Sequence, residues 1–246
     1  MKCVYGVIHT DEPLEFNVKP VGGIGPVQTA VADGLALVVS SVGEPKIRPS
    51  RRNMLAHTMV LEKVMESHDV LPMRFGLIIE DVEDAKKLLK DHRDVISKRL
   101  DDVSGHVEFG VKAIWDQKLL FDRILQERDD LREMRQELAG RPAQETYYQR
   151  IEIGRALETA VQGENDRLLA EAHPVFDKLA TDSVINERKD QMTAIDTAYL
   201  VRRDDQDEFE RLIDQQFADA GEELQVKLVG PVPPFNFVNL SIDWSI

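Results

Sequence analysis

The sequence predicts a mixed α+β protein with two domains: an N-terminal ferredoxin-like α/β sandwich over residues 1–116 and a C-terminal α+β domain over residues 117–246 with a long αα-hairpin. Three observations support this prediction. Short apolar runs and amphipathic stretches alternate through the first half, as in a layered α+β fold. Residues 117–172 change to charged sequence with helical periodicity. The net charge of −14 is also uneven: residues 1–115 carry 15 basic and 17 acidic side chains, and residues 116–246 carry 16 and 28.

Four strands are expected in the first half, because four short runs are rich in apolar, β-branched and aromatic residues. They are residues 3–8, 35–40, 73–79 and 107–115. The prolines and glycines of residues 11–26 predict a loop. A short helix near residues 26–32 is the one further element considered there.

Two helices are expected between these strands, because apolar residues recur at helical spacing. The first begins at a cap, Ser50 or Asn53, and ends near His68. Its buried stripe consists of Met54, Leu61, Val64 and Met65. The second spans residues 81–100 and carries His92 on its apolar face, as a hydrogen-bonded core residue. The resulting order of strands and helices predicts the ferredoxin-like sandwich.

The αα-hairpin is expected over residues 117–172, where two amphipathic helices flank the breaker Gly140-Arg141-Pro142. The first helix has the apolar stripe Leu119, Leu120, Ile124, Leu125, Leu131, Met134 and Leu138. The second has the stripe Tyr148, Ile151, Leu157, Val161, Leu168 and Leu169. Strands are then expected at 184–190, 196–201 and 224–230, with an acidic helix over 204–220. The order of strand, acidic helix, glycine and alternating strand weakly repeats that of residues 73–115.

The sequence predicts no catalytic, cofactor or metal site. It contains no phosphate-binding loop, no His-Glu-x-x-His and no Gly-x-Ser-x-Gly. Its six histidines form no pair at metal-ligand spacing, and the single cysteine, Cys3, excludes an intramolecular disulfide and a multi-cysteine metal site. Residues 21–25 could cradle an anion, but they lack the third glycine of a dinucleotide fingerprint, so a plain loop is favoured.

The charge and hydropathy of the chain bear on its partners and location. An acidic surface repels phosphate backbones and anionic lipid headgroups, so neither nucleic acid nor a membrane is an expected partner. No run approaches the ~20 apolar residues of a membrane-spanning helix. The apolar stretch of the first residues is too short for a signal peptide, so we expect a cytoplasmic protein.

Two charge clusters each have a functional and a plain interpretation. The basic group Lys46, Arg48, Arg51 and Arg52 could dock an acidic partner, but a solvated loop before a helix is favoured. The acidic run 204–223 could hold a cation. It lacks the glycine and the alternation of an EF-hand loop, so a solvated helix face is favoured.

Two short segments are more informative. Leu71-Pro72-Met73-Arg74-Phe75-Gly76, the 71–76 motif, places an arginine among apolar strand residues, where it is expected to form an ion pair at the sheet edge. Gly230-Pro231-Val232-Pro233-Pro234-Phe235-Asn236-Phe237-Val238, the 230–238 motif, contains three prolines that fix an extended turn. This second motif is interpreted as a rigid connection to a final strand, with a recognition surface as the alternative.

The chain resembles the gas vesicle protein GvpF/GvpL family in four segments that keep their order and spacing over most of the sequence. They are the first eight residues, Met1-Lys2-Cys3-Val4-Tyr5-Gly6-Val7-Ile8; the stretch from His57 through the 71–76 motif; Val107-Glu108-Phe109-Gly110-Val111-Lys112; and the 230–238 motif. The two motifs together make the resemblance fairly specific. Val232 departs from the family pattern, which often has an aromatic residue there.

This resemblance implies a non-enzymatic accessory or minor structural protein of gas vesicles, the protein-walled, gas-filled compartments that give cells buoyancy. It implies a location in the cytoplasm at the gas vesicle, and contacts with the small hydrophobic shell protein and other accessory proteins during assembly. It also agrees with the two-domain fold and the absence of a cofactor. The interaction candidates are Leu71, Pro72, Met73, Arg74, Phe75, Gly76, Gly230, Pro231, Pro233, Pro234, Phe235 and Phe237.

Three alternatives stay open. The protein could be a ligand-sensing or regulatory module with ferredoxin-like halves, or an enzyme with dispersed catalytic residues. Residues 238–246 alternate strictly between apolar and polar, which predicts a terminal strand. We expect this strand to dock on the protein's own sheets, with addition to a shell subunit as the alternative.

Overall fold

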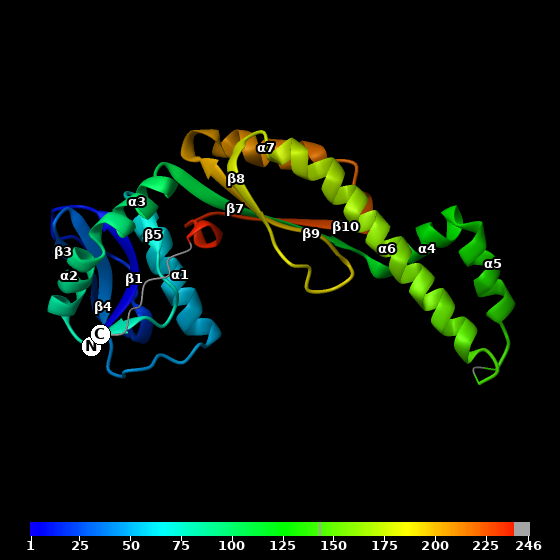
Figure 1. The fold of residues 1–246 in the computed structure, drawn as a ribbon, viewed down its shortest axis with the longest axis horizontal. Helices are drawn as coiled ribbons and strands as arrows, with labels where there is room; N and C mark the ends of the chain where they lie inside the picture. Colours follow the sequence, from blue (N-terminus) through cyan, green and yellow to red (C-terminus); the bar gives the residue numbers. More distant parts are fainter. Residues whose placement is uncertain (143, 239–246) are drawn as a thin grey trace. The chain divides into compact units, whose positions relative to one another are not determined.

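The structure is a computed structural model that describes residues 1–142 and 144–238. Its contacts divide the chain into two compact units, one of Met1–Glu108 with the segment from Pro231 onward and one of Phe109–Gly230. The mixed α+β class is confirmed, since each unit combines antiparallel strands with helices (Figure 1). The domain ranges 1–116 and 117–246 and the ferredoxin-like topology stay predictions. The strand expected over 238–246 lies, after Val238, outside the described residues.

The first unit contains one six-stranded sheet. Its strands are β1 (Lys2–His9), β2 (Glu15–Phe16), β3 (Ile24–Ala32), β4 (Leu35–Ser41), β5 (Val70–Pro72) and β6 (Ile78–Ile79). The order is β2-β3-β4-β1-β5, and β6 also pairs with β1. Its helices are α1 (Arg51–Met65), α2 (Val82–Asp91) and α3 (Arg93–Val103), with a short 3-10 helix, η1 (Val21–Gly23), before β3.

The helix considered near residues 26–32 is wrong, because these residues belong to β3. This strand pairs with β4 along most of its length, from Val27 opposite Ser40 to Ala32 opposite Leu35. Asp33 and Gly34 connect the two strands, and both have positive φ angles (52° and 83°). An Asp-Gly pair with these angles matches the right-handed twist of a tight hairpin.

The single strand expected over residues 73–79 is also wrong. Two short strands, β5 and β6, both pair with β1: Gly6 lies opposite Pro72, and Cys3 lies opposite Ile78. The residues between them leave the sheet in a turn. Gly76 has a φ of 90° there, a backbone conformation that favours glycine.

Helices cover both faces of this sheet (Figure 1). Alternate residues of β4, such as Leu35 and Leu37, join α2 and α3 in one apolar cluster. On the other face, the Ser40 hydroxyl lies 2.7 Å from the Tyr5 hydroxyl, and the Tyr5 ring lies against His57 of α1. Because side chains alternate along β4, one set of its residues packs against α2 and α3 and the other set faces α1.

The helix predictions of the first unit hold in part. Ser50 caps α1 as expected, because its hydroxyl accepts a hydrogen bond from the Asn53 amide. Met54 is 52% exposed, so it is not part of the buried stripe. The helix expected over 81–100 is broken at His92, which is only half-buried and not a core residue. The apolar periodicity stays in phase across His92, which explains why the pattern predicted one helix.

The second unit contains a four-stranded sheet of order β10-β7-β9-β8. Its strands are β7 (His106–Trp115), β8 (Ala180–Ile185), β9 (Thr193–Arg202) and β10 (Leu224–Val232). Its helices are α4 (Gln117–Glu127), α5 (Asp129–Leu138), α6 (Tyr147–Phe176) and α7 (Gln206–Gln216). Three 3-10 helices complete the described elements of the chain: η2 (Arg203–Asp205), η3 (Gly221–Glu223) and η4 (Phe235–Phe237). The strand expected at 184–190 lies earlier, at β8.

An aromatic cluster joins this sheet to α6 and α7. The Phe209 ring of α7 lies 5.3 Å from Phe109 of β7 and 5.5 Å from Tyr199 of β9, measured between centroids. Phe176, at the end of α6, lies 5.8 Å from Tyr199. Such offset and edge-on pairs add to the free energy of burial, so they fix both helices on one face of the sheet.

The expected αα-hairpin is present, with α4 and α5 running back along α6 (Figure 1). Its first arm is two helices rather than one, because the backbone is extended at Arg128. Leu125 is 9% exposed, as the stripe predicted, whereas Leu119 is 39% and Tyr148 is 78% exposed. Arg123 of α4 ties the arms together, since its guanidinium hydrogen-bonds Glu164 of α6 at 2.9 Å.

We predict that Gly6→Ala destabilises the protein. A Cβ at this position would lie 2.8 Å from Val70 Cγ2 and 2.9 Å from the Leu71 carbonyl oxygen, so β1 and β5 would have to separate. Overpacking of this kind costs roughly 1–3 kcal/mol. Urea denaturation measures the loss. The control is Gly154→Ala in α6, where no atom lies within 4 Å and stability should rise by up to about 1 kcal/mol. Equal effects of the two substitutions would contradict the prediction.

A second prediction concerns the hairpin seam. Leu125→Asp places an unpaired charge in a buried position and should cost several kcal/mol of unfolding free energy. Leu119→Asp makes the same chemical change in the first turn of the same helix, at an exposed position that tolerates an acidic residue. Thermal unfolding of both variants tests this. An unchanged Tm for Leu125→Asp would show that the stripe is not buried.

Candidate functional site

The structure brings the two sequence motifs together in the first unit. Leu71 and Met73 belong to the apolar cluster beneath α2 and α3. Phe237 and Val238, from the other motif, pack against the same cluster. Segments separated by more than 150 residues therefore contribute to one core, and the compact unit includes both.

The apolar members of the 71–76 motif are buried along β1. Leu71 lies opposite Val7 in the sheet, and the Met73 amide donates to the Tyr5 carbonyl oxygen at 2.8 Å. Arg74 is exposed in the turn and makes no ion pair with any described carboxylate, so the expected sheet-edge ion pair is wrong. The arginine follows the buried strand instead of lying within it.

The 230–238 motif changes from exposed to buried along its length. Gly230 and Pro231 are exposed near the end of β10, whereas Pro233 and Pro234 are buried. Phe235 is 38% exposed, and Phe237 is half-buried on the apolar cluster. Pro231 belongs to β10, and Pro233 and Pro234 lie between β10 and η4. The rigid connection to a final strand stays a prediction, because that strand lies outside the described residues.

A buried carboxylate that the sequence analysis missed fixes this connection. Glu108 of β7 is 5% exposed, and its carboxylate accepts hydrogen bonds from the Asn236 amide at 2.7 Å and from Asn236 Nδ2 at 2.6 Å. Burial raises the pKa of Glu108 above its ordinary value, and the two bonds from Asn236 oppose this shift. The sequence carried no signal of this contact, because Glu108 occupies a polar position of a strand in which apolar and polar residues alternate.

His57 is buried on the other face of the sheet. Its ring centroid lies 5.3 Å from that of Tyr5 and 5.6 Å from that of Phe75, so the 71–76 motif also contacts α1. Its Nε2 atom has no hydrogen-bond partner among the described residues. Burial lowers the pKa of His57 to about 4, so the ring is neutral at neutral pH. Burial also raises the pKa of the Cys3 thiol to about 12, which removes its nucleophilic character.

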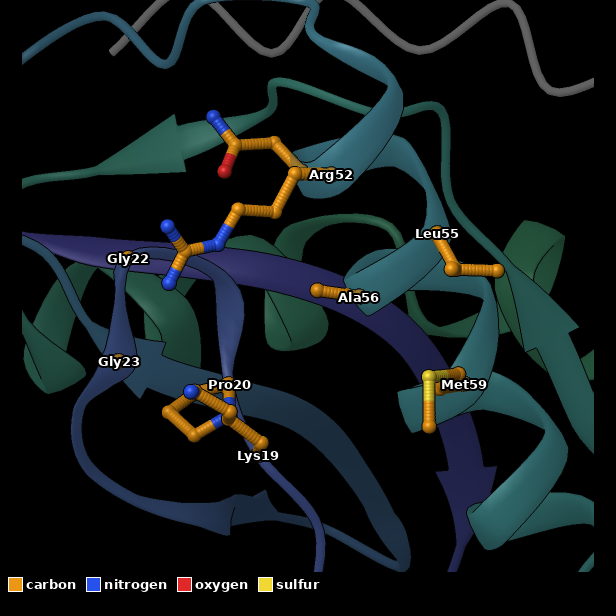
Figure 2. A pocket seen from close by; sticks show the side chains of 9 residues that line it. Lys19, Pro20, Gly22, Gly23, Arg52, Leu55, Ala56 and Met59 are labelled. Atoms are coloured by element: carbon orange, nitrogen blue, oxygen red, sulfur yellow. The ribbon is translucent and has the colours of Figure 1, made fainter.

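An open cavity of about 360 Å³ lies between η1 and α1 (Figure 2). Its lining combines backbone at two glycines, cationic side chains and exposed apolar side chains. The residues are Lys19, Pro20, Gly22, Gly23, Arg52, Asn53, Leu55, Ala56 and Met59. Arg52 comes from the basic group that the sequence analysis singled out. We call this cavity the α1 groove.

The residues that line the α1 groove offer a ligand apolar contact, cationic charge and backbone hydrogen bonds. No three His, Cys, Asp or Glu side chains in residues 1–142 and 144–238 are grouped so as to hold a metal ion. Within the same ranges, none of the helices combines the length and the hydropathy that crossing a membrane requires.

Comparison with known proteins decides the family. The family model described as "Gas vesicle synthesis protein GvpL/GvpF" matches residues 2–239. The chain belongs to the GvpL/GvpF family. It is 32% identical to gas vesicle protein F of Streptomyces sp. (strain CB03234), over 96% of this chain and 98% of the relative. It is 25% identical to gas vesicle protein F of Dolichospermum flosaquae, over 96% and 97% of the two chains.

The fold is that of solved structures in the same family. The crystal structure of GvpF from Anabaena sp. PCC7120 superimposes with a TM-score of 0.83 at 21% identity, over 98% of this chain and 99% of that one. GvpF from Microcystis aeruginosa gives a TM-score of 0.78 at 22% identity, over 97% and 99%. Membership of the GvpL/GvpF family supports a role in gas vesicle assembly and an association with other gas vesicle proteins.

We predict that acid destabilises this protein through His57. Its pKa is about 4 in the folded chain and 6.5 ordinarily, so between these values the unfolded chain takes up a proton that the folded chain does not. The free energy of unfolding therefore falls as the pH drops from 6.5 to 4, by roughly 3 kcal/mol at ~1.4 kcal/mol per pKa unit.

His57→Leu should remove this part of the pH dependence, measured by urea denaturation at several pH values. The opposing contribution of Glu108, whose raised pKa favours the folded state on acidification, is common to both proteins and cancels in the difference. Val60→Ala, which shortens another buried side chain of α1 and removes no titratable group, is the control: it should lower the stability and keep the wild-type slope. Parallel curves for the wild type and His57→Leu would contradict the assignment.

Proposed function

We propose that this protein is a non-enzymatic accessory or minor structural protein of gas vesicle assembly, located in the cytoplasm at the vesicle. In this role it contacts the small hydrophobic shell protein and other accessory proteins. The observation that carries the proposal is the family match over residues 2–239, which spans both compact units.

A physical argument supports contact with the shell protein. A wall that excludes liquid water needs a strongly apolar inner face, and its unassembled subunits would aggregate through apolar patches and strand edges. A partner with a net charge of −14 stays soluble and repels further copies of itself. Binding to such a partner would keep the subunits dispersed until they join the wall.

The candidate residues of the two motifs divide by exposure in this proposal. The buried members, such as Leu71, Met73 and Pro233, hold the two segments in the fold. The exposed members are available to a partner, and Arg74 and Phe235 are those with large side chains. Gly76, Gly230 and Pro231 are exposed as well. An arginine and an aromatic ring are also the side-chain types that contribute most to binding at protein interfaces.

The proposal is tested in a host that makes gas vesicles from a defined gene set. Omitting the gene for this protein should reduce or abolish vesicles seen by electron microscopy, and a plasmid copy should restore them. In parallel, the tagged full-length protein should co-purify with the shell protein when the two are co-expressed without the other genes. Normal vesicles without the gene, together with no co-purification, would contradict the proposed function.

A further inference from the structure

Helix α1 has apolar side chains on two opposite faces. His57, Val60, Leu61 and Val64 follow the spacing i, i+3, i+4, i+7 and are buried in the unit. Leu55, Ala56 and Met59, together with Arg52, repeat the same spacing five residues earlier. This shift is about 140° around the helix, so they lie on the outer face. Leu55 is 57% exposed and Met59 is 48% exposed. A helix with a second apolar stripe has a second surface that can be buried by a partner.

The outer stripe forms one wall of the α1 groove, and the residues of η1 form the other. Gly22 and Gly23 have φ angles of 75° and 69°, and no atom lies within 4 Å of a Cβ built on Gly22. Figure 2 shows the Arg52 guanidinium extending over Gly22, with Leu55 and Met59 further along the helix. The groove therefore has a cationic end and an apolar end, both open to solvent.

Two unpaired cations line this groove, and three more lie near α1 in the sequence. Lys19 and Arg52 line it, and Lys46, Arg48 and Arg51 precede or begin α1. None of the five forms an ion pair with a carboxylate of the described residues, although the chain has 45 acidic residues. The sequence contains no aspartate or glutamate between residues 45 and 61. The site keeps its positive charge free in an otherwise acidic protein.

We propose that the α1 groove docks an amphipathic helix of a protein partner, with the partner's apolar face on Leu55 and Met59 and its carboxylates beside Arg52 and Lys19. The occupant is a helix because the i, i+3, i+4, i+7 stripe of α1 presents ridges that pack into the grooves of another helix. It is acidic because Lys19 and Arg52, the two cations that line the groove, form no ion pair with a carboxylate of the described residues. Methionine suits such a surface, since its flexible thioether side chain adapts to the shape of the partner.

This inference rests on the proposed function, because it takes the ligand of the groove to be a protein. Its test uses purified components. The full-length protein is titrated with three labelled peptides of about five helical turns: an amphipathic Leu/Glu helix, a Leu/Lys helix of the same pattern, and a scrambled Leu/Glu peptide. Fluorescence anisotropy should detect the Leu/Glu helix alone. Its affinity should fall as salt is raised, because the charges involved are exposed.

Single substitutions then locate the site. Arg52→Glu and Leu55→Ser should each weaken binding of the Leu/Glu helix at least tenfold. Lys87→Glu and Val95→Ser are the matched controls, since Lys87 is an exposed cation of α2 and Val95 is a 53% exposed apolar residue of α3 in the same unit. Both controls should bind like the wild type. All four positions are exposed, and circular dichroism verifies that the variants fold.

Four outcomes would overturn the proposal. The first is binding of the Leu/Lys or scrambled peptide as tightly as the Leu/Glu helix, and the second is unchanged affinity in both groove variants. The third is an increase in Tm with inorganic phosphate alone that Arg52→Glu abolishes. The fourth is self-association, measured by light scattering, that the same substitution abolishes. The last two would assign the groove to a small anion or to a second copy of the chain. Normal vesicles in cells that lack the gene, together with intact peptide binding in vitro, would contradict the proposed function alone.

Discussion

The first unit depends on the burial of the central residues of strand β1. Its residues from Cys3 to Ile8 are inaccessible, and it pairs with β4 on one edge and with β5 and β6 on the other. Gly6 permits this arrangement, because any side chain there would meet the Val70 side chain and the Leu71 backbone. The 71–76 motif begins in β5, which pairs with β1. The chain then leaves β1 in a turn and pairs with it again at β6. The conformation of the motif is thus set by the strand beside it.

Much of the fold could be predicted because single strong signals decide it. The apolar runs of β1, β4 and β9 and the breaker at Gly140 were sufficient for their elements. The β3–β4 hairpin had an equally clear signal, Asp33-Gly34 between apolar runs, but the prolines and glycines before it favoured a loop. The breaks at His92 and Arg128 left the apolar periodicity in phase, so the pattern could not reveal them. A solved relative has the same fold at 21% identity. This agrees with a fold that is determined by the hydrophobic pattern more than by individual residues.

The candidate site was less predictable, because long-range contacts determine it. In the sequence, Glu108 is an ordinary polar residue of an alternating strand. Its hydrogen-bond partner, Asn236, is 128 residues away, so no local pattern predicts the contact. His57 carried no local signal of its contacts with Tyr5 and Phe75. The sequence contains both apolar stripes of α1, but helical spacing alone does not tell which of them faces the core. Met54, expected in the buried stripe, is exposed.

Charge distribution gives the α1 groove a significance that its shape alone would not have. An acidic partner is repelled by most of a protein whose net charge is −14. It is attracted only where cations outnumber carboxylates, and residues 45–61 are such a place because they contain no acidic residue. Electrostatic attraction acts before contact and sets the orientation of approach, whereas apolar burial acts only after contact. A groove that joins free cations to exposed Leu55 and Met59 therefore selects a partner's orientation first and then stabilises it. An apolar patch without the cations would bind any exposed apolar surface, which is the association that an assembly protein must avoid.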